Sequence, residues 1–205
     1  LPGYFMIIRF YFQIGDYENA DHYIRKYIDA GGDCGGIGQY QKLLRTQGQF
    51  SDAFNFINTR CGSGDCDRIC LSSLFQISWI MGEFEKAEQY FLEWKETRNP
   101  RRFYERNNYE IGYVYFQLGK QEEAAQIFKE ALQYLQAHLE RTGNQLHLSR
   151  IYAFQGERKK ALMHLSEYAN TGFVEGWHDF ILLDPFFESL RDDPEFKAIV
   201  KQAQE

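Results

Sequence analysis

One short pattern recurs through most of this chain: a glycine is followed five residues later by an alanine, with mostly polar residues between them. The first copy runs from Gly15 to Ala20, and the other four begin at Gly48, Gly82, Gly119 and Gly156. Successive glycines lie 33, 34, 37 and 37 residues apart. A fixed period in the mid-thirties is typical of repeat proteins, in which each unit buries its apolar face against its neighbours. The pattern therefore favours an interaction scaffold and does not identify the partner.

The residues around the first glycine predict two helices joined by a tight turn. Apolar residues recur at helical spacing over residues 4–14 and again over residues 18–30. A glycine just past the end of a helix adopts a positive φ without a Cβ clash, so Gly15 predicts the end of the first helix. The apolar faces of the two helices are Tyr4, Ile7, Ile8 and Tyr11, and Ala20, Ile24, Tyr27 and Ile28.

The same template predicts four more helix pairs. Their helices are expected over residues 36–46 and 51–58, 67–81 and 85–97, 102–118 and 121–141, and 144–155 and 158–170. The corresponding repeats cover residues 1–33, 34–66, 67–101, 102–142 and 143–172. We expect all of them to belong to one all-α domain that spans residues 1–205.

The tail departs from this template, and we interpret residues 173–205 as a cap over the last repeat. A short helix is expected to begin at Gly176. Asp184-Pro185 and Asp193-Pro194 each place an acidic N-cap before a proline, which marks a helix start. Two further short helices are therefore expected, over residues 185–191 and 194–204.

These residues resemble the tetratricopeptide repeat family, and the fourth copy fits the family pattern best. Its matching residues are Ile111, Gly112, Tyr115, Gly119, Ala124, Phe128, Ala131 and Leu132. The resemblance implies a right-handed superhelical solenoid of about five helix-turn-helix repeats. The tail from Leu183 to Phe196 is similar to the ends of bacterial repeat arrays that are fused to signalling or regulatory modules. Because Leu1 is not a methionine, we expect the chain to be a fragment of such a larger bacterial protein.

The resemblance also implies a binding groove lined by the first helix of each pair. Counted from the turn glycine, the groove positions carry Arg9, Phe12, Lys42, Arg45, Gln76, Trp79, Tyr109, Tyr113, Phe116 and Arg150. Arginine pairs well with carboxylates, and aromatic side chains are common interface anchors. The set predicts a groove for a peptide or protein partner with acidic character. In the alternative interpretation, the aromatic side chains pack between helices and the cations are solvated.

Charge and hydropathy narrow the class of partner. The net charge of −6 argues against general binding of nucleic acid or of anionic membranes. The chain has no apolar run of the 18 or more residues that a membrane span needs. We expect a soluble domain, with a cytoplasmic and a periplasmic location both open.

Four cysteines offer a sharper alternative. Cys61, Cys66 and Cys70 fall within ten residues, and Cys34 lies one repeat earlier. They could complete a tetrahedral zinc site, form a disulfide between Cys61 and either Cys66 or Cys70, or remain free thiols. The spacing does not match the paired motif of a zinc ribbon, so no metal or other cofactor is predicted.

The sequence thus predicts a non-catalytic scaffold for protein–protein interaction. It contains no readable arrangement of a nucleophile with its base, so no enzyme is expected. Two alternatives stay open at this point: a structural oligomerisation module, and a regulatory domain that depends on thiols or zinc.

Overall fold

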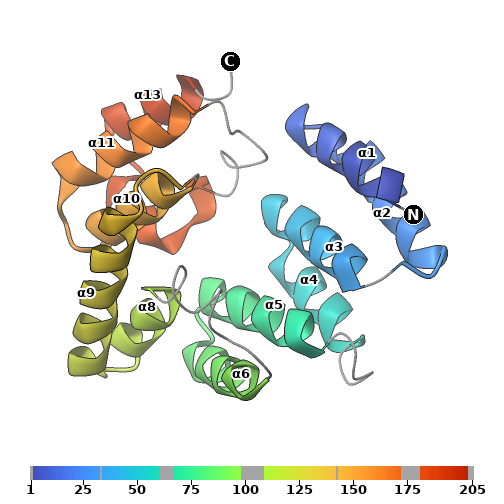
Figure 1. Cartoon of the computed structure of the whole chain (residues 1–205), viewed down its shortest axis with the longest axis horizontal. Helices are drawn as coiled ribbons and strands as arrows, with labels where there is room; N and C mark the ends of the chain where they lie inside the picture. The colour runs from blue at the N-terminus through green and yellow to red at the C-terminus, as the bar shows by residue number, and fades with distance from the viewer. Residues whose placement is uncertain are drawn as a thin grey trace. The chain divides into compact units, whose positions relative to one another are not determined.

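The computed structural model describes residues 2–32, 34–60, 67–97, 109–141, 143–171 and 181–202. Every regular element in these ranges is a helix (Figure 1), which confirms the all-α prediction. No helix in the same ranges is long and apolar enough to cross a membrane.

The chain divides into two compact units, and the first holds the described residues up to Thr97. Its helices are α1 (Pro2–Gln13), α2 (Tyr17–Asp29), α3 (Cys34–Thr46), α4 (Phe50–Asn58), α5 (Asp67–Ile80) and α6 (Phe84–Glu96). They form three consecutive helix pairs, shown from blue to green in Figure 1. Each pair also packs on the next one, because α2 contacts α3, and α5 contacts both α3 and α4.

The second unit holds the described residues from Tyr109 onward. Its helices are α8 (Tyr109–Gln117), α9 (Gln121–Ala137), α10 (Asn144–Phe154), α11 (Arg158–Ala169), the 3₁₀ helix η1 (Pro185–Leu190) and α13 (Pro194–Gln202). Helices α8 and α9 form one pair and α10 and α11 form the next, with α10 also packed on α9. The tail covers this last pair, since η1 contacts α10 and α13 contacts α11.

Each helix pair turns at its predicted glycine. The five glycines have φ values of 70°, 72°, 77°, 77° and 75°, in the left-handed region that favours glycine. In the first turn, the backbone N–H of Gly15 donates to Phe12 O at 3.3 Å and that of Asp16 donates to Tyr11 O at 3.0 Å. The same two bonds recur at the other four turns. They form a Schellman motif, which satisfies carbonyl groups at the end of the first helix.

The alanine of each copy is buried near the start of the second helix of its pair. All five have an exposed fraction of 1% or less: Ala20, Ala53, Ala87, Ala124 and Ala161. A larger side chain at these positions would separate the two helices, since protein interiors are close-packed. The recurring glycine and alanine are thus explained as a turn residue and a contact residue.

The tail also follows the predicted capping chemistry. Asp184 Oδ1 accepts a hydrogen bond from the backbone N–H of Phe186 at 3.0 Å, and Asp193 Oδ1 accepts one from that of Glu195 at 2.9 Å. Both N-cap predictions are confirmed. Residues 185–190 form a 3₁₀ helix rather than an α-helix, and 3₁₀ geometry is common in segments this short.

The remaining helix predictions agree with the observed ends to within a few residues. The first part of the helix predicted for residues 102–118 lies outside the described residues, as does the start of the helix predicted from Gly176. Residues 181–183 of the latter are helical. The single-domain assignment stays a prediction.

Two glycines in α3 should respond in opposite ways to alanine substitution. A Cβ on Gly36 would lie 2.8 Å from Cδ1 of the buried Tyr27 and 3.0 Å from Cγ1 of Ile28, whereas one on Gly38 meets no atom within 4 Å. We expect Gly36→Ala to destabilise the protein by about 1–3 kcal/mol through overpacking. Gly38→Ala should stabilise it by about 0.5–1 kcal/mol, because glycine weakens a helix interior. Urea unfolding of both variants measures the difference, and equal midpoints would contradict it.

Candidate partner-binding site

The predicted groove residues of the first unit contact one another. Lys42 Nζ lies 4.7 Å from the centroid of the Phe12 ring, a cation–π contact. Arg45 donates a hydrogen bond from a terminal guanidinium nitrogen to Gln76 Oε1 at 2.8 Å. These two contacts link α1 to α3 and α3 to α5. Polar side chains at the groove positions therefore also hold neighbouring repeats together.

Exposure separates the predicted residues of the first unit into two groups. Arg9 is exposed, and Lys42, Arg45 and Gln76 are partly buried. Phe12 and Trp79 are each only 1% exposed, so both aromatic side chains contribute to packing in the core. Partner binding by the exposed and partly buried members stays a prediction.

In the second unit, three of the four predicted residues lie inside the protein. Tyr109, Tyr113 and Arg150 are 0%, 7% and 5% exposed. Arg150 Nε donates to Asp184 Oδ2 at 2.6 Å, and a terminal nitrogen of Arg150 donates to the Tyr109 hydroxyl at 2.9 Å. The Tyr109 hydroxyl is also 2.7 Å from His147 Nδ1. Arg150 is therefore held inside the unit rather than presented to a partner.

This buried network joins the helical repeats to the tail. Burial alone would lower the pKa of Arg150, but the adjacent Asp184 and Tyr109 outweigh it and hold that pKa above its ordinary value. Burial raises the pKa of the Tyr109 hydroxyl, against the opposing effect of Arg150. The charged arginine and the neutral tyrosine therefore persist across the physiological pH range. Asp184 uses its other oxygen to cap η1, so one carboxylate serves both contacts.

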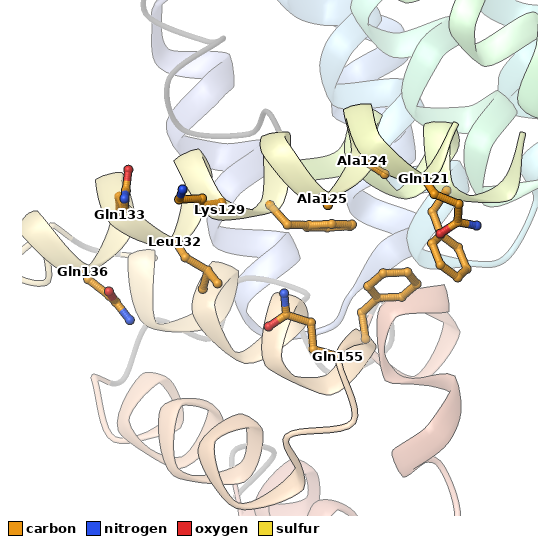
Figure 2. A pocket seen from close by; sticks show the side chains of 11 residues that line it. Gln121, Ala124, Ala125, Lys129, Leu132, Gln133, Gln136 and Gln155 are labelled. Atoms are coloured by element: carbon orange, nitrogen blue, oxygen red, sulfur yellow. The ribbon is translucent and has the colours of Figure 1, made fainter. Parts of the chain in front are cut away.

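The fourth predicted residue, Phe116, lines a pocket in the same unit. The pocket has a volume of about 740 Å³ and follows α9, with the ends of α8 and α10 on its other side (Figure 2). Its lining is Phe116, Gln121, Ala124, Ala125, Phe128, Lys129, Leu132, Gln133, Gln136, Phe154 and Gln155. We call this pocket the α9 groove. Its volume falls within the range of about 300–1,000 Å³ that is typical of ligand sites.

The two helices α9 and α10 beside the groove differ in length. α9 has 17 residues, whereas α10 has 11. At about 1.5 Å per residue, α9 is longer than α10 by about 9 Å. Gln136 Nε2 donates to the Tyr152 hydroxyl at 2.8 Å, which ties the C-terminal end of α9 to α10.

Aromatic side chains form the apolar wall of the α9 groove. The Phe154 ring lies 5.0 Å from the rings of both Phe116 and Phe128. The Phe154 ring also lies 5.9 Å from the ring of Phe186 in η1, so the tail packs against this wall. Phe128 is 5% exposed, whereas Phe116 is 40% exposed. An apolar side chain entering the groove would therefore meet Phe116 first.

The rim of the α9 groove is polar and carries one charged group. Figure 2 shows Gln121, Lys129 and Gln133 along one helix and Gln155 on the neighbouring helix. Side-chain amides both donate and accept hydrogen bonds, as the backbone of an extended peptide requires. Among the described residues that line the groove, Lys129 is the only charged one and none is a carboxylate. The groove is thus suited to a segment with an apolar anchor and a negative charge.

The cysteines differ from the sequence predictions. Cys34 is disulfide-bonded, whereas Cys70 is a buried thiol that takes part in no disulfide. A pairing of Cys61 with Cys70 is therefore wrong. A zinc site that uses all four thiols is also wrong, because zinc needs thiolates. Cys61 and Cys66 lie outside the described residues.

In the part of the chain that the structure describes, no three His, Cys, Asp or Glu side chains are grouped closely enough to hold a metal ion.

Sequence reasoning identified Asp184 as a helix cap but missed its pairing with Arg150. The two residues are 34 positions apart, and no periodic pattern links them. It also missed the wall residue Phe154, which lies on the first helix of its pair but not at a groove position, and it missed the glutamines of α9, because the family resemblance directed attention to the first helices.

Removing the carboxylate of Asp184 should strongly destabilise the second unit. We expect Asp184→Ala to cost about 3–5 kcal/mol, because it leaves the Arg150 charge buried without its partner. The double substitution of Arg150→Met with Asp184→Leu should recover much of that loss. Asp192→Ala is the matched control, since the Asp192 side chain is fully exposed. Chemical unfolding that gives Asp184→Ala the stability of this control would contradict the account.

The matches to a known protein family fall on two of the predicted repeats. The family model described as tetratricopeptide repeat matches residues 1–30 and 105–134, which fall on the first and fourth helix pairs. No curated protein matches the chain significantly. The two matches coincide with two of the helix–glycine–helix units described above, and they support the assignment of this chain to the tetratricopeptide repeat family.

Proposed function

We propose that this chain is a non-catalytic scaffold that binds a segment of another protein in the α9 groove. Tetratricopeptide repeats generally mediate protein–protein interactions. The observation that carries the proposal is a groove of about 740 Å³ with aromatic walls and an amide-rich rim. Such a surface suits a flexible peptide, whose backbone needs hydrogen bonds and whose side chains need an apolar contact.

The dimensions of the α9 groove suggest the length of the bound segment. Gln121 and Gln136 mark its two ends along α9. Their separation of about 22 Å, at about 1.5 Å per helical residue, would accommodate six or seven residues of an extended chain at about 3.3 Å each. A large apolar side chain would enter beside Phe116, and an acidic side chain would pair with Lys129. This acidic side chain agrees with the acidic character of the partner that the sequence predicts.

The setting of the scaffold is part of the same proposal. The similarity of residues 183–196 to the ends of bacterial signalling arrays supports a place within a larger bacterial signalling or assembly protein. The disulfide at Cys34 supports an oxidising compartment such as the periplasm, because disulfides persist where thiols are not kept reduced. Mass spectrometry of the native protein without reductant would test this location. A disulfide at Cys34 would support an oxidising compartment, and a reduced Cys34 thiol would contradict it.

Charge reversal in the α9 groove should abolish partner capture. We expect tagged wild-type protein to retain its partner from extracts of the native host, and Lys129→Glu to lose it through repulsion of the acidic segment. Phe116→Ser should also weaken retention, because it removes the exposed part of the apolar wall. Quantitative mass spectrometry of the captured proteins is the measurement.

Lys201→Glu provides the matched control for this experiment, since it makes the same charge change on α13, outside the groove. Circular dichroism establishes that all variants keep their helices. Full retention of the partner by both Lys129→Glu and Phe116→Ser would contradict the proposal.

A further inference from the structure

A second, smaller pocket of the same unit is lined by residues of α8, α10 and η1 and has a volume of about 250 Å³. Each of these elements supplies one aromatic side chain, namely Tyr113, Phe154 and Phe186. The Tyr113 ring centroid lies 5.4 Å from that of Phe154 and 5.0 Å from that of Phe186. We call this pocket the η1 pocket. Phe154 also lines the α9 groove, so the two sites are adjacent.

The polar part of the η1 pocket carries one negative charge. Its side chains are Gln117, Glu188 and Ser189, all of them exposed. Among the described residues that line the pocket, Glu188 is the only charged one. No residue in the part of the chain that the structure describes forms an ion pair with Glu188. The η1 pocket thus combines three aromatic rings with a carboxylate that is available to a cation from outside.

The carboxylate of Glu188 acts on the aromatic lining. Burial and, next to it, the negative charge of Glu188 raise the pKa of the Tyr113 hydroxyl, while Arg191 has a smaller opposite effect. Arg191 is exposed and lies outside the lining. The backbone also fixes this arrangement, because Ser189 Oγ donates to Ala153 O at 3.3 Å and so holds η1 on α10.

These features select the chemistry of the occupant. An apolar side chain would cover Glu188 without giving its charge a partner, which is costly, and an acidic one would be repelled. A basic side chain can place its methylene groups and its charge against the aromatic rings and pair with the carboxylate. Arginine fits best, because its planar guanidinium stacks on aromatic rings while it donates several hydrogen bonds. The volume lies below the range of about 300–1,000 Å³ for whole ligands, so it suits one side chain.

We propose that the η1 pocket binds the guanidinium group of an arginine presented by a protein partner. One part rests on the proposed function, namely that this arginine belongs to the segment bound in the α9 groove. Because Phe154 lines both sites, a residue close to the apolar anchor of that segment would reach the η1 pocket. Lys129 and Glu188 together would then select a segment that carries an acidic residue, an apolar residue and an arginine.

Blocked arginine, N-acetyl-arginine methylamide, is the probe for the η1 pocket. We expect millimolar concentrations to shift the backbone amide signals of Glu188 and Ser189 saturably in NMR spectra of the isotope-labelled full chain. N-acetyl-citrulline methylamide has nearly the same shape without the charge and should bind at least about fivefold more weakly. Glu188→Gln should weaken binding of the arginine probe about tenfold, because it removes the charge that faces the guanidinium.

Glu140→Gln is the matched control, since it removes the same charge from a side chain that is 71% exposed and lies outside the η1 pocket. It should bind the probe as the wild type does. The proposal would be overturned by the absence of saturable shifts, by equal binding of the citrulline probe, or by an equal loss with Glu140→Gln. Free L-arginine that binds about tenfold more tightly than the blocked probe would also overturn it, because the pocket would then be a site for a free amino acid.

The η1 pocket and the α9 groove can fail separately. Lys129→Glu should bind the arginine probe as the wild type does, whether or not it loses the partner, because Lys129 lines only the α9 groove. In partner capture, Glu188→Gln should weaken retention of the protein that the wild type retains. Full retention by Glu188→Gln would overturn the assignment of the arginine to the segment in the α9 groove.

Discussion

The positive φ of five glycines is the constraint on which the rest of this structure depends. At each of them the chain ends one helix with two backbone hydrogen bonds and begins the next helix two residues later. Any other residue would pay a steric penalty for this conformation. Because the turn is the same each time, the residues at a given distance from the glycine fall on the same face of every pair. The buried alanines and the interface between successive pairs follow from that fixed phase.

This dependence explains how much of the fold could be predicted. Helix ends and buried alanines were readable because they are set locally, by periodicity and by the turn. The Arg150–Asp184 ion pair was not, because it joins residues 34 positions apart through tertiary packing. The same limit applies to Cys34, whose bonding depends on which segments meet in space. The 3₁₀ form of η1 is a smaller departure, since the start of that helix was correctly located at Pro185.

The candidate site was only partly predictable for a related reason. The family resemblance placed the binding surface on the first helix of each pair, and Phe116 is the predicted residue that lies both exposed and in the α9 groove. Most of the lining comes instead from α9, a second helix. The groove is lined by residues of α8, α9 and α10, which belong to two helix pairs, and such an arrangement cannot be read from one repeat. Arg150 and Tyr109 stabilise the attachment of the tail, and Phe186 in that tail supports the aromatic wall.

Site-specific photo-crosslinking on α9 tests the proposed scaffold role most directly. A photoreactive residue would replace Gln133, which lines the α9 groove, or Gln126, which lies on the same helix outside the lining and donates to Glu130 Oε1 at 2.6 Å. Irradiation in the native host should yield a covalent adduct with the partner from position 133 and little or none from position 126. An adduct that forms from position 126 but not from position 133 would contradict the account.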